Sequence, residues 1–126
     1  MATILVVDDS AFMRMRCVAL LKELGHETLE AGDGAQALEI YRQAKPDAVL
    51  LDISMPVMDG LEALRAMMSL DPAARVAMVS AMGQQAVIME AIKAGARDFV
   101  VKPFDPERFA AAVAKLIGSR EGAPAG

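Results

Sequence analysis

Five short runs rich in Val, Ile and Leu alternate along the chain with longer segments whose apolar residues recur at helical spacing. This alternation is typical of repeated strand–helix units, which place their strands in one parallel sheet with helices on its faces. We therefore predict an α/β fold in which every strand ends at the same edge. The predicted strands cover residues 3–7, 27–31, 48–51, 76–79 and 98–101.

The segments between these runs carry apolar stripes that predict helices. The stripes stop at Gly25, Pro46, Pro72 and Gly95, which are residues that end helices or start turns. A fifth helix begins at Asp105-Pro106-Glu107, where a cap, a proline and an acid favour a helix start. The side chains predicted to face the core are Met13, Cys17, Leu20, Leu21, Leu24, Ala37, Leu38, Tyr41, Leu61, Leu64, Met67, Met68, Ile88, Ala91, Ile92, Phe109, Val113, Leu116 and Ile117.

The size of the chain fits one domain. With 126 residues, of which 55% are hydrophobic, it has enough apolar surface for a single core. We predict one domain over residues 1–117. Residues 118–126 are small and polar without a helical period, and we predict that they form a disordered tail.

Composition also excludes several classes of function. The net charge of −4 and the aromatic content of 4% argue against nucleic-acid binding, which needs basic and stacking residues. No apolar run reaches the roughly 20 residues of a membrane span, and the first residues do not resemble a signal peptide. We expect a monomeric cytoplasmic protein. The single cysteine, Cys17, lies in an apolar helical pattern and is predicted to be a buried, inert thiol.

Polar residues follow four of the predicted strands. Asp8-Asp9, Asp52, Ser80 and Lys102 each come at or just after the end of an apolar run. Because parallel strands bind ligands in the crevice at their carboxyl ends, these side chains are predicted to share one site. Three carboxylates, a hydroxyl and an amine suit a divalent cation and a phosphoryl group. Mg²⁺ is the natural cation, because it prefers carboxylates and phosphate oxygens.

Asp52 is the predicted nucleophile of this site. It ends the most apolar strand, where a carboxylate is costly unless it is solvated, paired or bound to metal. A carboxylate can attack phosphorus and form an acyl phosphate if the transferring charge is neutralised, here by Mg²⁺, Lys102 and a hydrogen bond from Ser80. Each residue also has an ordinary explanation: Asp8-Asp9 as turn acids, Ser80 as a strand-end hydroxyl and Lys102 as a surface amine.

These residues resemble the receiver domains of response regulators. The resemblance rests on Val7-Asp8-Asp9, on DISMPVMDG from Asp52 to Gly60, on Ser80-Ala81 and on Lys102-Pro103, and it spans nearly the whole chain. It implies a flavodoxin-like sheet of five strands in the order 2-1-3-4-5 with five flanking helices. The strings DDSAFMRM, SAMGQQ and DFVVKPF resemble the chemotaxis branch of that family.

The resemblance also implies a role for individual residues. A histidine kinase would donate the phosphoryl group to Asp52. Asp9, Asp52 and the backbone carbonyl of Ser54 would bind Mg²⁺ directly, and Asp8 would bind it through water. The bond before Pro103 would be cis. The residues that tune hydrolysis of the acyl phosphate would be Ser54 and Met82.

The implied switch pairs a hydroxyl with an aromatic ring. Phosphorylation would draw Ser80 inward, and Phe99 would rotate into the vacated space. Thr and Tyr are common at these positions in the family, so a methyl group and a phenol hydrogen bond are absent here. The alternative for Phe99 is an ordinary core aromatic.

The implied function is that of a regulator rather than a metabolic enzyme. The domain would catalyse its own phosphorylation and slow dephosphorylation, and it would signal through the fourth helix, last strand and last helix. The expected partners are a histidine kinase, the flagellar motor switch protein and a phosphatase. Two alternatives stay open: a phosphorelay shuttle that passes the phosphoryl group to a histidine phosphotransfer protein, and a phosphohydrolase of the haloacid dehalogenase type.

Overall fold

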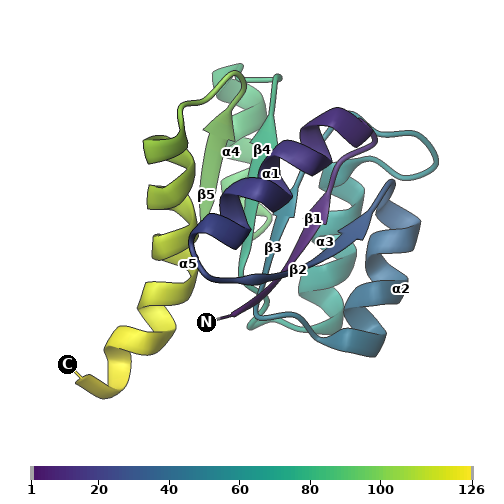
Figure 1. Ribbon diagram of the computed structural model, residues 1–126. Coiled ribbons are helices and arrows are strands. Elements are labelled where there is room, and N and C mark those ends of the chain that lie inside the picture. Colours follow the sequence, from purple (N-terminus) through teal and green to yellow (C-terminus); the bar gives the residue numbers. More distant parts are fainter. Residues whose placement is uncertain (1, 126) are drawn as a thin grey trace.

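In the computed structural model of the protein, residues 2–125 are described, with their side chains as far as residue 118. This part of the chain forms a five-stranded parallel sheet in the order β2-β1-β3-β4-β5 (Figure 1). Its strands are β1 Thr3–Val7, β2 Glu27–Ala31, β3 Ala48–Leu51, β4 Val76–Ser80 and β5 Asp98–Val101. Its helices are α1 Ala11–Glu23, α2 Gly34–Ala44, α3 Gly60–Leu70, α4 Gln85–Lys93 and α5 Pro106–Ala125. The flavodoxin-like fold and its strand order are therefore confirmed.

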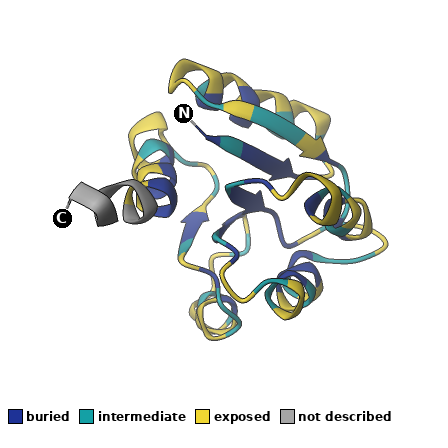
Figure 2. Ribbon diagram, turned by 90° about the horizontal axis from the view of Figure 1, so that it is seen from below, coloured by how far each residue is buried: buried dark blue, intermediate teal, exposed yellow. Residues whose placement is uncertain are grey.

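Two apolar cores lie on opposite faces of the sheet. On β1, Leu5 and Val7 face the core that α2, α3 and α4 cover, whereas Ile4 and Val6 face the core that α1 and α5 cover. This alternation follows from the period of two along a strand. Figure 2 shows the buried strands at the centre, with the exposed surfaces of the helices turned outward. Both faces of the sheet are covered, as in most parallel sheets.

The order in which strands are added to the sheet reverses at β1. After β1 it runs to the edge strand β2 and then crosses to β3 on the other side, so that Val7 pairs with both Ala31 and Leu51. In open α/β sheets, ligands bind at the carboxyl ends of the strands where this change of direction occurs. The fold therefore places its crevice at the ends of β1 and β3.

Short polar side chains cap the starts of four helices, α1, α2, α3 and α5, whereas α4 has no side-chain cap among the described residues. The side chains of Ser10 and Asp33 accept hydrogen bonds from the first turns of α1 and α2. Asp59 forms a capping box with Glu62 at the start of α3, and Asp105 accepts the Arg108 N–H at the start of α5. These caps satisfy amide groups that a helix leaves unpaired, and they fix the loops around the crevice.

Two residues predicted to face the core are instead exposed. Leu24 is 44% exposed because it is the C-cap of α1 and lies beyond its last regular turn. Ile92 is 46% exposed because α4 buries only Ala91 among its described residues and leaves the rest of its surface partly or fully open. The burial of Cys17 is confirmed, and that burial raises the pKa of its thiol to about 11.

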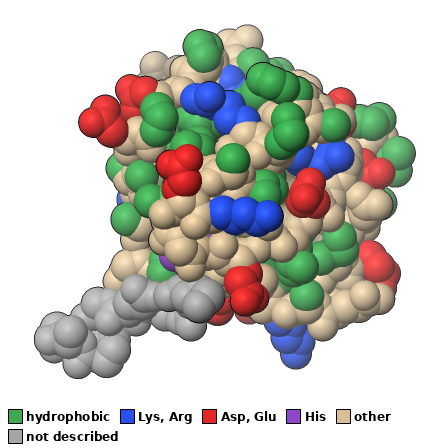
Figure 3. Space-filling view, viewed as in Figure 1, with side chains coloured by type: hydrophobic (Ala, Val, Ile, Leu, Met, Phe, Trp, Pro, Cys, Tyr) green, Lys and Arg blue, Asp and Glu red, His purple; other side chains and the backbone are tan. Residues whose placement is uncertain are grey.

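Other predictions of the sequence concern the surface and the end of the chain. Among residues 2–125, no helix is both long enough and apolar enough to cross a membrane. On the face shown in Figure 3, acidic, basic and hydrophobic side chains are interspersed. The segment predicted as a disordered tail, residues 118–126, is described as far as Ala125, and its backbone there continues helix α5. The tail and a domain boundary at residue 117 stay predictions.

Gly60 lies where the β3–α3 loop is tightly packed, and a substitution there tests this packing. A Cβ atom at this position would meet the backbone of Asp52 and would lie 2.7 Å from the Ile53 Cα. Because a backbone cannot move aside as a side chain can, we expect Gly60→Ala to destabilise the protein by about 3 kcal/mol or more. The measurement is urea unfolding.

Gly118→Ala is the matched control for this change. A Cβ atom at Gly118 would meet nothing within 4 Å. The control is expected to leave the protein as stable as before or to stabilise it by up to about 1 kcal/mol through helix propensity. Equal free energies of unfolding for the two variants would contradict the close approach at Gly60.

Candidate functional site

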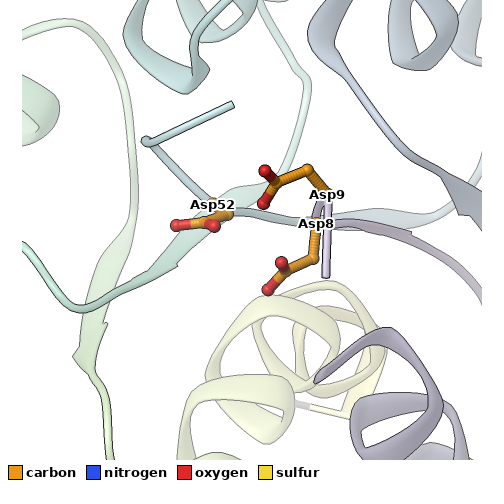
Figure 4. A group of neighbouring side chains, drawn as sticks. All are labelled: Asp8, Asp9 and Asp52. Carbon is orange, nitrogen blue, oxygen red and sulfur yellow. The ribbon is translucent and has the colours of Figure 1, made fainter. Parts of the chain in front are cut away.

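The polar residues at the strand ends lie together in the structure. Asp8, Asp52 and Ser80 are buried, whereas Asp9 is exposed. One carboxylate oxygen from each of Asp8, Asp9 and Asp52 lies within 4.8 Å of the others. Figure 4 shows Asp8 and Asp9 leaving the chain on opposite sides, with Asp52 beside them. The sheet thus brings three acids from two separate segments to one point.

Backbone hydrogen bonds fix where these side chains begin. Asp8, Asp52 and Lys102 each come one residue after a strand, yet their amides still bond to the neighbouring strand. The Asp8 N–H donates to Ala31, the Asp52 N–H donates to Val7 at 3.0 Å and the Lys102 N–H donates to Ser80 at 2.9 Å. The functional side chains therefore start from the rigid sheet rather than from free loops.

Lys102 is shared between the two buried carboxylates. Its Nζ lies 2.7 Å from Asp8 Oδ2 and 3.5 Å from Asp52 Oδ2. Burial alone would lower the pKa of Lys102, but the hydrogen bond with Asp8 and the charge of Asp52 outweigh it and raise that pKa. The ammonium group is therefore charged and offsets the repulsion between the two acids.

Asp52 retains a raised pKa despite this partner. Burial is the largest cause, and the negative charge of Asp8 adds to it. Lys102, the Ile53 N–H and a hydrogen bond with Ser80 act in the opposite direction without cancelling it. The ionised Asp52 is thus destabilised where it lies, so an added positive charge would be favourable there.

The three acids differ in what their oxygens already bind. Asp8 Oδ1 accepts the Ser10 N–H at 2.9 Å and Asp8 Oδ2 accepts Lys102, so both of its oxygens are occupied. Among the described residues, the Asp9 side chain has neither a hydrogen bond nor an ion pair. Hard carboxylate oxygens without Cys or His fit Mg²⁺. The acidic triad is typical of a Mg²⁺ site.

A shallow pocket beside the triad brings the two predicted rate-tuning residues together. It has a volume of about 530 Å³ and is lined by Asp9, Ile53, Ser54, Met55, Asp59, Leu61 and Met82. Within it, the Ser54 hydroxyl donates to the Met82 sulfur at 3.1 Å. The roles predicted for Ser54, in metal binding and in rate tuning, and for Met82 stay predictions.

Ser80 and Phe99 lie on the same face of the sheet. Phe99 pairs with Met78, which is two residues before Ser80 and therefore points to the same side. Phe99 is buried in the core that α2, α3 and α4 cover, and the Ser80 hydroxyl accepts the Met82 N–H at 3.2 Å. The bond between Lys102 and Pro103 is cis, as the resemblance implied.

Sequence reasoning missed an ion pair that holds the backbone of Phe99. Arg108 donates to both carboxylate oxygens of Asp98, at 3.1 and 2.9 Å, and to the Phe99 carbonyl at 3.0 Å. Asp98 in turn accepts the Phe99 N–H at 2.8 Å. The spacing of ten residues between Asp98 and Arg108 has no helical or strand period, so no sequence signal revealed the pair.

Comparison with known proteins assigns the class. The model of the response regulator receiver domain matches residues 4–114. The chain belongs to this family, which is not a family of metabolic enzymes, and this argues against the phosphohydrolase alternative.

Within the family, the chain is CheY-like. It is 49% identical to the chemotaxis protein CheY of Thermotoga maritima over 90% of this chain and 95% of that protein. It is 50% identical to CheY of Bacillus subtilis, over 90% and 96% of the two chains. A crystal structure of the CheX-CheY-BeF3-Mg²⁺ complex from Borrelia burgdorferi matches with a TM-score of 0.89 and 34% identity, over 91% of this chain and 88% of that one.

Asp52 and Asp98 are expected to affect stability in opposite directions. The pKa of Asp52 is raised, chiefly by burial, so its ionised form costs stability above that pKa and the cost is relieved as the pH falls through it. The pKa of Asp98 is lowered, chiefly by the Arg108 hydrogen bond, so its contribution is present above the usual value of about 3.9 and is lost as the pH falls through the lowered pKa.

Urea unfolding in EDTA tests these signs. At pH 7, Asp52→Asn should raise the free energy of unfolding and Asp98→Asn should lower it, each by roughly 1 kcal/mol. Both differences should shrink toward pH 3. A shift of the free energy of unfolding in the same direction for both variants at pH 7 would contradict these pKa directions.

Proposed function

We propose that the chain accepts a phosphoryl group on Asp52 from the phosphohistidine of a kinase, with Mg²⁺, and then signals by binding another protein. The observation that carries this proposal is the position of Asp52. Its carboxylate is buried, lies within reach of the exposed Asp9 and has the Lys102 ammonium 3.5 Å away. An acceptor, a metal ligand and a fixed positive charge are thus present together.

The contacts of Asp52 indicate which of its oxygens reacts. Oδ1 accepts the Ile53 N–H at 2.7 Å, whereas Oδ2 faces the Lys102 ammonium at 3.5 Å, which would also stabilise the incoming phosphoryl oxygens. We therefore assign Oδ2 as the nucleophile. Its electron pair forms the new bond to phosphorus, the bond from phosphorus to the donor's imidazole nitrogen breaks, and that nitrogen keeps the electron pair. Lys102 and the Ser80 hydroxyl then hold phosphoryl oxygens through charge and a hydrogen bond.

The metal would be held on the open side of the triad. Asp9, Asp52 and the Ser54 backbone carbonyl would bind it directly, and Asp8 would act through water because both of its oxygens are engaged. When bound, Mg²⁺ supplies positive charge that neutralises the phosphoryl oxygens.

The output surface would lie on α4, β5 and α5. Met89 and Ile92 on α4 and Val101 on β5 are large apolar residues with exposed fractions of 51%, 46% and 41%. Large apolar side chains left exposed on neighbouring elements are candidates for a protein-binding surface. Ser80 would move toward the phosphoryl group, and Phe99 would then rotate into the space that Ser80 leaves. These movements would alter the output surface mainly through changed side-chain packing. In chemotaxis the partner would be the flagellar motor switch protein, with a phosphatase such as the CheX of the similar complex ending the signal.

Phosphoryl uptake tests the acceptor. With Mg²⁺ and either phosphorylated kinase or acetyl phosphate, the wild type should gain one phosphoryl group by intact-mass spectrometry, and Asp52→Asn should gain none. Asp59→Asn is the matched control, because Asp59 lines the same pocket and asparagine caps a helix equally well. Uptake by Asp52→Asn, or undiminished uptake by the wild type in EDTA, would contradict the proposal.

The Ser54–Met82 contact is proposed to shield the acyl phosphate from water. Met82→Glu replaces this apolar cover with a carboxylate that can carry water, so we expect faster loss of the phosphoryl group from the isolated protein. The measurement is the decay of the phosphorylated fraction after the donor is removed. Met89→Glu is the control, since Met89 lies on the exposed surface of α4. Shielding by Met82 is excluded if both variants decay at the wild-type rate.

A further inference from the structure

Arg14 ties three elements together beside the acidic triad. It lies in the first turns of α1, and its side chain is only 23% exposed. Its Nη1 donates to the backbone carbonyl of Asp8 at 2.6 Å, and its Nε lies 3.3 Å from Glu30 on β2. The guanidinium group therefore spans from α1 across the end of β1 to β2.

The carbonyl that Arg14 holds belongs to the peptide between Asp8 and Asp9. Three further bonds hold the Asp8 side of this turn: the Asp8 N–H donates to Ala31, and the Asp8 side chain accepts the Ser10 N–H and the Lys102 ammonium. The exposed Asp9 side chain has no bond of its own among the described residues. The position of the Asp9 carboxylate therefore depends on its backbone, and Arg14 fixes the peptide from which it starts.

The positive charge of Arg14 would weaken Mg²⁺ binding, whereas its positioning of Asp9 would strengthen it. A guanidinium beside three acids repels a divalent cation, but Glu30 partly offsets that charge and solvent screens it. A charge-assisted hydrogen bond is roughly twice as strong as one between neutral groups. Loss of the groups that orient metal ligands typically weakens metal binding about 10–100-fold. Positioning should therefore prevail over repulsion.

We propose that Arg14 is a positioning residue of the metal site, which sets Mg²⁺ affinity by fixing the turn that presents Asp9. This inference rests on the proposed function, because it assumes that Asp9 binds Mg²⁺. Arg14 need not touch the metal or the phosphoryl group. It acts through the Asp8 carbonyl and the Asp9 backbone.

The test is the Kd for Mg²⁺, measured by isothermal titration calorimetry. Arg14→Ala combined with Glu30→Ala removes the tether without changing net charge, and we expect binding about tenfold weaker than that of the wild type. The control pair Arg42→Ala with Glu39→Ala removes an exposed ion pair on α2 and should leave the Kd unchanged. Arg14→Lys keeps the charge but loses the forked donor, and it should weaken binding less than the pair.

A second arm separates positioning from general loss of structure. In an Asp9→Asn background, where binding is already weaker, removing Arg14 and Glu30 should cause no further tenfold loss. Urea unfolding checks that each variant folds cooperatively. If the tether pair binds Mg²⁺ like the wild type, or loses equal affinity in both backgrounds, the role of Arg14 is overturned. A wild type that binds no Mg²⁺ would overturn the proposed function as well.

Discussion

The rest of the site depends on one ammonium group placed between two buried carboxylates. Asp8 follows β1 and Asp52 follows β3, and these strands are neighbours, so the fold itself forces two like charges together. Lys102 Nζ, which arrives after β5, lies within 3.5 Å of both acids. Without a shared cation, burial of both charges would be strongly unfavourable. The site is thus assembled around a positive charge that a phosphoryl group can also use.

The same arrangement connects the site with the output surface proposed on α4, β5 and α5. Lys102 is bonded through its amide to Ser80, and three residues earlier Phe99 is buried on the face that Ser80 shares. Arg108 and Asp98 hold the Phe99 backbone from both sides, so a change at Phe99 is confined to its side chain. A shift in partner affinity of roughly 1–3 kcal/mol, which is 5–150-fold, needs no larger rearrangement.

The sequence predicted correctly those features that follow from strand positions in a parallel sheet. Asp8, Asp9, Asp52, Ser80 and Lys102 could be brought to one edge because parallel strands all end there. The sequence could not show which oxygens Lys102 binds, nor the contacts of Arg14 and Arg108. These long side chains contact residues on other helices and strands, and such contacts follow no regular spacing in the sequence. It also misplaced Leu24 and Ile92, since helical spacing does not reveal whether a neighbouring element covers a residue.

Lys102 partly offsets the charges of the two buried acids before any metal binds, and the site depends on this compensation. The most direct measurement is the free energy of unfolding of Lys102→Met in EDTA and in Mg²⁺. We expect a loss of about 3 kcal/mol in EDTA, because two buried carboxylates lose their partner. Mg²⁺ should then stabilise the variant more than it stabilises the wild type. A variant as stable as the wild type in EDTA would contradict this claim.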